Sequence, residues 1–158
     1  MRIYKLTSSS PEETRQLAAA TAALLKGGEI LFFSGPIGAG KTVMVSGIAA
    51  AFGFKERPVS ASFSLIKKYK NKSAVIYHID LFRLRCDEMF NLGFEEMLQD
   101  DSAIILAEWP DAAKDFFPQQ RLEIDIALKQ GAGRDITFTA RGKIYEELLD
   151  NLCKAIKK

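Results

Sequence analysis

Apolar residues recur along this chain at the three- and four-residue spacing of amphipathic helices in three long segments. The first helix is expected to begin within segment 8–13, where hydroxyl residues precede a proline and two acids, and to end at Gly27 and Gly28. The second runs from about 41 to 52, and the third closes the chain over 144–156 with a charged outer face. The apolar faces consist of Leu17, Ala20, Ala23 and Leu24 in the first helix and Ile144, Leu148, Leu149, Leu152 and Ile156 in the last.

Two kinds of strand are expected between these helices. Segments 30–33 and 103–107 are apolar at every position, which is typical of strands buried on both faces of a sheet. Four further segments flank short polar or glycine-rich turns and predict two antiparallel hairpins, 64–70 with 74–79 and 122–128 with 136–140. Weaker periodicity over 86–98 predicts two short helical turns. Together these elements predict one three-layer α/β domain over residues 1–158, with a mixed central sheet that includes antiparallel hairpins.

Composition narrows the class of protein. The chain has 158 residues, 47% hydrophobic and 27% charged, which suffices for one sizeable core. A formal net charge of +2 is too mild to demand a polyanionic partner. Cys86 and Cys153 are far apart, so neither a zinc site nor a disulfide framework is suggested. The N-terminus lacks the apolar core of a signal peptide, and no apolar run approaches the ~20 residues of a membrane span, so a soluble cytoplasmic protein is expected.

The strongest chemical signal is the segment Gly35–Thr42, which fits the pattern G-x-x-x-x-G-K-[ST] in full. It lies between a predicted strand and a predicted helix, and this context disfavours an ordinary glycine-rich turn. Glycines let backbone N–H groups wrap a phosphate, and the helix N-terminus adds partial positive charge. Lys41 would reach the β- and γ-phosphates, while the Thr42 hydroxyl would bind Mg²⁺, which prefers oxygen ligands. The predicted nucleotide-binding residues of this loop are Gly35, Ile37, Gly38, Ala39, Gly40, Lys41 and Thr42.

Mg²⁺ usually needs a second anchor from a carboxylate at the end of a neighbouring strand, and two candidates are present. Asp80 follows the first hairpin and Glu108 follows the second buried strand; spacing alone does not choose between them, and both also fit ordinary acids at strand ends. His78, the only histidine, points to the same side of its strand as Asp80 and is interpreted as a packed, hydrogen-bonded side chain. Trp109 follows Glu108 and fits a cover for the site or a partly buried packing residue.

Other nucleotide-binding classes fit less well. A GTPase would carry N-K-x-D, whereas the nearest match, Asn71–Ala74, lacks the aspartate and lies in a predicted tight turn. A small-molecule kinase needs a basic lid, for which only Arg83–Arg85 could serve. A nucleotide-sensing module without catalysis is the third alternative. Basic residues in the middle third fit an RNA or acidic-protein surface, or simply a solvated hairpin: Lys55, Arg57, Lys67, Lys68, Lys70, Lys72, Arg83 and Arg85.

Four segments, taken in order, resemble the TsaE (YjeE) family: Gly35–Thr42, Val59–Leu65, Tyr77–Leu84 and Leu106–Pro110. The resemblance covers nearly the whole chain. It implies a P-loop NTPase fold and a bacterial ATPase that uses ATP and Mg²⁺ and is slow when alone. It also implies that the protein works with the TsaD and TsaB proteins in making threonylcarbamoyladenosine in tRNA, with tRNA as a further partner through that complex.

The resemblance also implies roles for individual residues. The family's metal ligands correspond to Thr42 and Glu108, so Asp80 becomes the residue that orients or activates the attacking water. Asp80, Ser62 and Lys41 are therefore the expected catalytic residues. In the segment that resembles the family's switch loop, Ala61 replaces proline and Ser62 replaces threonine. The hydroxyl survives, while loss of the proline increases the loop's conformational freedom.

The remaining expectations concern the nucleotide base and the wall of the site. Trp109 resembles a wall of the phosphate site. Adenine contacts are expected near Pro11 and in the turn of residues 131–134, which includes Gly133.

Overall fold

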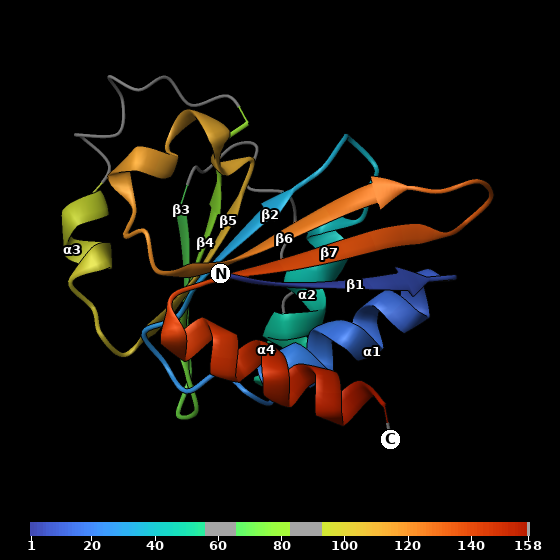
Figure 1. Cartoon of the computed structure of the whole chain (residues 1–158). Coiled ribbons are helices and arrows are strands. Elements are labelled where there is room, and N and C mark those ends of the chain that lie inside the picture. The colour runs from blue at the N-terminus through green and yellow to red at the C-terminus, as the bar shows by residue number, and fades with distance from the viewer. Residues whose placement is uncertain (56–65, 83–92, 158) are drawn as a thin grey trace.

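The computed structural model describes residues 1–55, 66–82 and 93–157, and these residues form one seven-stranded sheet (Figure 1). The strand order is β1-β7-β6-β2-β5-β4-β3. The four central strands β6, β2, β5 and β4 run parallel, whereas β7, β1 and β3 pair antiparallel with their neighbours. The predicted mixed sheet and both predicted hairpins are therefore confirmed. The strands are β1 (Arg2–Ser8), β2 (Ile30–Ser34), β3 (Ile66–Lys70), β4 (Val75–Asp80), β5 (Ala103–Glu108), β6 (Arg121–Leu128) and β7 (Arg134–Arg141).

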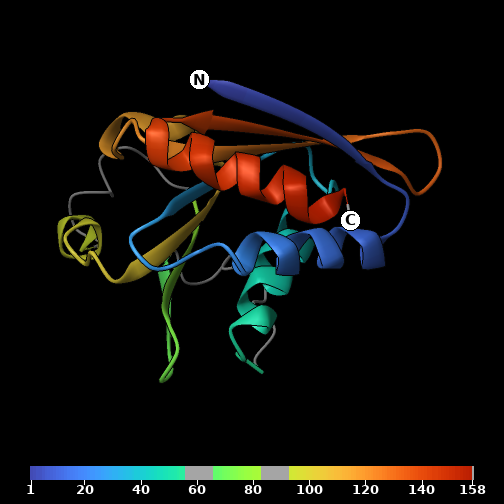
Figure 2. The same cartoon turned by 60° about the horizontal axis from the view of Figure 1, so that its bottom comes forward.

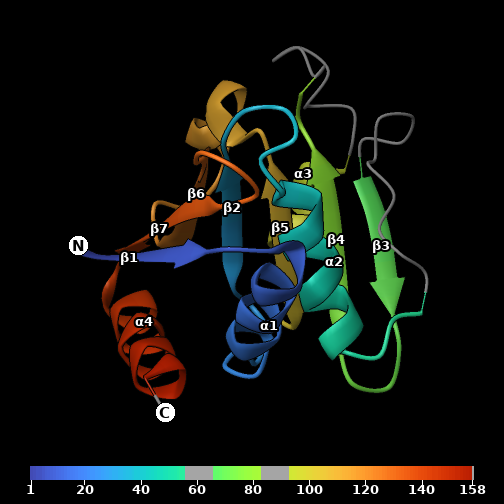
Figure 3. The same cartoon turned by 90° about the vertical axis from the view of Figure 1, so that its right-hand side faces the viewer.

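The helices occupy both faces of the sheet, but to different extents. The three longer helices, α1 (Pro11–Ala22), α2 (Lys41–Ala51) and α4 (Lys143–Ile156), lie on one face (Figures 1 and 2). Figure 3 shows α1 and α2 side by side in front of the strands. The short helix α3 (Phe94–Leu98) and the 3-10 turns η2 (Pro110–Ala112) and η3 (Lys114–Phe116) lie on the other face. No helix in the described residues is both long and apolar enough to cross a membrane.

Alternation along the strands divides the apolar residues into two cores. Leu31 and Phe33 of β2 pack under the long helices, together with Leu149 of α4. Ile30 and Phe32 point the opposite way, toward α3 and Phe117. The second core covers β2, β5 and β4, whereas β6 and β7 contribute mainly polar side chains to that face. This uneven covering leaves an open polar area beside η2 and η3.

Four features differ from the sequence-based expectations. Ala23, expected on the apolar face of the first helix, is exposed just beyond its end, whereas Ala18 and Ala22 are buried. β1 was not predicted, although Tyr4 and Leu6 pack against the first core and the strand pairs with all of β7. The first helix ends at Ala22, before the glycine pair, because the next residues form a tighter turn, in which the Leu24 N–H donates to the carbonyl oxygen of Thr21 at 3.0 Å and the Leu25 N–H to that of Ala22 at 3.1 Å. Ile144, which was expected on the apolar face of the last helix, is 64% exposed. Its neighbour Tyr145 is buried in the core instead, and the Tyr145 hydroxyl accepts a hydrogen bond from the Ile30 N–H at 2.8 Å.

Candidate functional site

The predicted phosphate loop connects the C-terminal end of β2 to the first turn of α2. Gly35, Gly38 and Gly40 all have positive φ, so this conformation suits glycine at each position. Gly35 has the strictest requirement, because a Cβ there would lie 2.1 Å from the carbonyl oxygen of Ile126 on β6. The first glycine of the loop is thus required by close contact with a neighbouring strand as well as by its own φ.

Two glycine substitutions should separate these effects. Gly35→Ala is expected to lower the free energy of unfolding by about 2–4 kcal/mol, because φ is +132° and the added methyl group meets backbone. Gly38→Ala, where a Cβ would meet nothing within 4 Å, should cost only ~1 kcal/mol of backbone strain. Urea unfolding of both variants measures the difference, and equal losses would contradict the role given to Ile126.

Lys41 is held close to the loop in the described structure. Its Nζ donates hydrogen bonds to the carbonyl oxygens of Gly35 at 2.7 Å and Pro36 at 2.9 Å, and lies 3.8 Å from the ring centroid of Trp109. Burial lowers the pKa of Lys41 below its usual value, although Glu108 and other nearby carboxylates raise it in part. A desolvated ammonium of this kind gains strongly from an anionic partner such as phosphate.

Thr42 in the first turn of α2, Glu108 at the end of β5 and His78 within β4 form a connected group. The Thr42 hydroxyl donates to Glu108 Oε2 at 3.2 Å, and His78 Nε2 lies 2.8 Å from Glu108 Oε1. Because a carboxylate only accepts, the His78 Nε2–H donates, which leaves Nδ1 with no partner among the described residues. His78 is fully buried, so the expectation of a packed, hydrogen-bonded histidine is confirmed, and it orients Glu108 toward Thr42.

Asp80 lies beside Glu108, because the two residues are register partners at the ends of β4 and β5. Asp80 is mostly buried, and its Oδ1 accepts a hydrogen bond from the Phe82 N–H at 3.1 Å. Both carboxylates line the same cavity as residues of the phosphate loop, as strand-end placement predicts. Trp109 has φ of 58°, and its ring packs on Phe82 with centroids 4.7 Å apart. This left-handed backbone turns the indole over Lys41.

These residues surround one cavity of about 410 Å³, here called the P-loop cavity. Its wall combines the loop, the two carboxylates and two aromatic side chains, and it consists of Ile37, Gly38, Gly40, Lys41, Thr42, Val43, Asp80, Phe82, Glu108 and Trp109. Within the described residues, no three His, Cys, Asp or Glu side chains are grouped to hold a metal. The oxygen donors Thr42 and Glu108 fit Mg²⁺, which usually takes one or two protein ligands and completes its shell with phosphate and water oxygens.

Arg134 is a residue of this site that sequence analysis placed only in a turn. Its guanidinium extends from the start of β7 and donates to the carbonyl oxygens of Ala39 at 2.7 Å and Gly38 at 3.2 Å. Because a trans peptide points its C=O and N–H in opposite directions, the Gly40 N–H faces away from Arg134. The hairpin of β6 and β7 thereby helps to hold the loop, a contact that no local motif reveals.

The roles of several other predicted site residues stay predictions. Ser62 and its neighbour Ala61 fall outside the described residues, and so does Arg83–Arg85. Pro11 is the first residue of α1, and Gly133 lies in the turn between β6 and β7. Neither lines the P-loop cavity, so their contacts with adenine stay a prediction.

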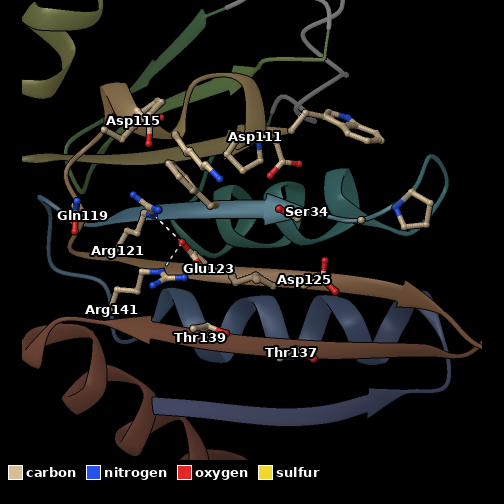
Figure 4. Close-up of a pocket in the computed structure, with 18 residues that line it drawn as sticks. Ser34, Asp111, Asp115, Gln119, Arg121, Glu123, Asp125, Thr137, Thr139 and Arg141 are labelled. Carbon is tan, nitrogen blue, oxygen red and sulfur yellow. Dashed lines mark hydrogen bonds and ion pairs between the residues drawn. The ribbon is translucent and has the colours of Figure 1, made fainter. Parts of the chain in front are cut away.

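A second and larger cleft, of about 900 Å³, adjoins the first (Figure 4). It lies over the polar face of β6 and β7, with η2 and η3 as its wall, and is called the polar cleft below. At one end Glu123 Oε1 accepts hydrogen bonds from Arg121 Nε at 2.9 Å and Arg141 Nε at 2.7 Å. Burial alone would raise the pKa of Glu123, but the two arginines outweigh it and hold the pKa below its usual value.

This ion-pair network predicts a pH-dependent contribution to stability. A carboxyl group with a lowered folded pKa stabilises the protein above its unfolded pKa, and the contribution is lost as pH falls through the folded pKa. Glu123→Gln should therefore lower the free energy of unfolding by ~1 kcal/mol at pH 7, with the difference shrinking below about pH 4.3. Urea titrations across pH 3–7 test this, with exposed Glu147→Gln as the control. A pH-independent difference would contradict it.

The fold and the loop define a protein of the P-loop NTPase class. The family model described as "Threonylcarbamoyl adenosine biosynthesis protein TsaE" matches residues 8–136. The tRNA threonylcarbamoyladenosine biosynthesis protein TsaE of Bacillus subtilis strain 168 is 36% identical over 98% of this chain and 96% of its own length. That of Rickettsia conorii is 37% identical over 76% of this chain and 69% of its own length. The chain belongs to the TsaE family, which takes part in tRNA threonylcarbamoyladenosine biosynthesis.

A solved structure supports the same assignment. The crystal structure of Bacillus subtilis YdiB superposes with a TM-score of 0.84 and 33% sequence identity, covering 98% of this chain and 96% of that chain. The resemblance drawn from four sequence segments is therefore confirmed over nearly the full length.

Proposed function

We propose that this protein is a cytoplasmic Mg²⁺-dependent ATPase that acts with the TsaB and TsaD proteins in forming N6-threonylcarbamoyladenosine in tRNA. Family membership supports the pathway. The observation that carries the chemistry is the 3.2 Å contact between the Thr42 hydroxyl and the Glu108 carboxylate, beside a phosphate loop whose lysine is buried. Paired oxygen donors next to such a loop suit a nucleoside triphosphate bound with Mg²⁺.

In this mechanism each residue of the P-loop cavity has one task. Lys41 leaves the carbonyl oxygens of Gly35 and Pro36 and donates to the β- and γ-phosphates. Thr42 and Glu108 hold Mg²⁺, which supplies positive charge to the phosphate oxygens when bound. Asp80, which lies next to Glu108 across the sheet, accepts a hydrogen bond from the attacking water.

Partner action completes the proposal. Ser62, outside the described residues, is proposed to assist Asp80 through its hydroxyl. Hydrolysis would then reset the loop around residue 62 and drive a cycle of partner binding and release. A protein of this design is slow alone and faster with its partners.

Phosphate release from ATP with Mg²⁺ tests the proposal, first with the purified chain and then with TsaB, TsaD and tRNA added. Stimulated release is expected for the wild type, and Lys41→Ala should reduce it by about 100-fold or more. Lys26→Ala is the matched control, because its exposed side chain lies before β2 whereas the phosphate loop follows β2. ATP consumption only with an added metabolite, together with a phosphorylated product, would instead identify a small-molecule kinase.

A further inference from the structure

The polar cleft is separate from the P-loop cavity, and Trp109 lines both. It touches Gly35 and Pro36, whose carbonyl oxygens bind Lys41 Nζ, and it touches Trp109, whose ring lies 3.8 Å from that nitrogen. An occupant of the polar cleft would therefore contact the groups that hold Lys41 without entering the P-loop cavity. This position suits a partner that influences the nucleotide site from outside.

The floor of the polar cleft is a sheet face that nothing in the described structure covers. α3, η2 and η3 pack over β2, β5 and β4, whereas β6 and β7 present Asp125, Thr137 and Thr139 to the open space (Figure 4). An antiparallel pair often keeps one face in water, so exposure alone has an ordinary explanation. The cleft differs from a plain solvated face because η2 and η3 wall it on one side and its charges are unevenly distributed.

The charged side chains of the polar cleft form two groups, one at each end of the cleft. At one end Arg121, Glu123 and Arg141 satisfy one another through the ion pairs already described. At the other end Asp125, the register partner of Ser34, and Asp111 of η2 line the cleft (Figure 4). Asp111, Asp115 and Asp125 make no hydrogen bond or ion pair with any side chain in the described part of the chain, and Lys114 is the only cleft cation left unpaired there. At the end nearest Trp109, two carboxylates that are unpaired in the described structure, Asp111 and Asp125, lie on the cleft side of one cation, Lys41, whose ammonium is bound by the carbonyl oxygens of Gly35 and Pro36.

We propose that the polar cleft docks a basic segment of a partner protein, with a lysine or arginine side chain meeting Asp111 and Asp125 beside Trp109. Charge complementarity favours this occupant, because the carboxylates repel phosphate groups of RNA or nucleotides and attract ammonium and guanidinium groups. The hydroxyls of Thr137 and Thr139 add hydrogen-bonding positions for the backbone of such a segment. The proposal rests on the proposed function for the choice of partner, the TsaB–TsaD complex.

The test compares two double variants that each remove two negative charges. Asp111→Asn with Asp125→Asn changes the polar cleft, and Asp101→Asn with Glu147→Gln changes exposed acids outside it. Affinity for the purified TsaB–TsaD complex is measured by biolayer interferometry, and ATP hydrolysis is measured with and without the complex. The cleft variant should raise the dissociation constant by about tenfold or more, and the control should stay within about twofold of the wild type. The ratio of stimulated to basal hydrolysis should fall in the cleft variant only.

Each outcome decides a different claim. Equal affinities of the cleft variant and wild type would overturn the docking proposal, and so would a wild type that does not bind the complex. If the cleft variant lost affinity for tRNA while its affinity for the complex was unchanged, the cleft would be a nucleic-acid surface and the proposal wrong. If no form hydrolysed ATP yet the affinity difference remained, the docking site would stand and the proposed ATPase function would fail. Thermal unfolding of both variants, expected to match the wild type because the side chains are exposed, guards against misfolding.

Discussion

Replacing Glu108 by glutamine is expected to lower Mg²⁺-dependent ATP hydrolysis by about 100- to 1,000-fold and to raise the Mg²⁺ concentration needed for half-maximal rate. The substitution keeps the size of the side chain and one oxygen that can accept from His78 Nε2, and the Thr42 hydroxyl can accept from the amide NH2 that replaces the other oxygen. It removes the negative charge with which Glu108 would bind Mg²⁺. Phosphate release measured across a Mg²⁺ titration gives both quantities.

Stability distinguishes this loss of function from damage to the fold. Glu108 is only 3% exposed, so in the metal-free protein its charge is costly to bury, and glutamine should leave the free energy of unfolding equal or higher. Thr42→Ser, which retains the hydroxyl, is the matched control and should stay near the wild-type rate. An unchanged Mg²⁺ requirement in Glu108→Gln would assign the metal to the other strand-end carboxylate, Asp80.

Local sequence patterns were sufficient to predict most strands of the sheet, because these strands either are apolar at every position or flank short turns. β2 and β5 were recognisable in this way, and both hairpins followed from alternation around polar or glycine-rich turns. β1 was missed because it is an edge strand that buries few side chains, and its pairing with β7 joins residues 126 to 138 positions apart. Ile144 was misplaced because helical spacing alone does not define which neighbouring residue, here Tyr145, faces the core.

The candidate site shows the same division between local and distant information. The loop from Gly35 and the strand-end positions of Asp80 and Glu108 are local features, and the parallel register of β4 and β5 brings the two carboxylates together. The hydrogen bonds of Arg134 to the loop were not predictable, because they depend on β6 lying next to β2 across a long connection. The same strand order creates the polar cleft. Its charged residues form no motif in the sequence, and only the folded sheet brings them together.

Asp80→Asn is expected to slow ATP hydrolysis by about 100- to 10,000-fold while leaving the affinity for ATP and Mg²⁺ close to that of the wild type. Asparagine keeps the oxygen that accepts from the Phe82 N–H at 3.1 Å, so the local backbone should not change. Asparagine lacks the negative charge with which Asp80, in the proposed mechanism, orients and activates the attacking water. The measurements are single-turnover hydrolysis and fluorescence titration of a labelled nucleotide.

Comparison with Glu108→Gln gives this prediction its control, because the two carboxylates are neighbours in the sheet yet have different proposed tasks. Loss of Mg²⁺ affinity should appear in Glu108→Gln and be absent from Asp80→Asn. Formation of threonylcarbamoyladenosine with TsaB, TsaD and tRNA then decides whether hydrolysis matters to the partners. If Asp80→Asn bound ATP, failed to hydrolyse it and still supported full product formation, nucleotide binding alone would be the function, as in a sensing module. If product formation fell with the hydrolysis rate, the chemistry at Asp80 would drive the partner cycle.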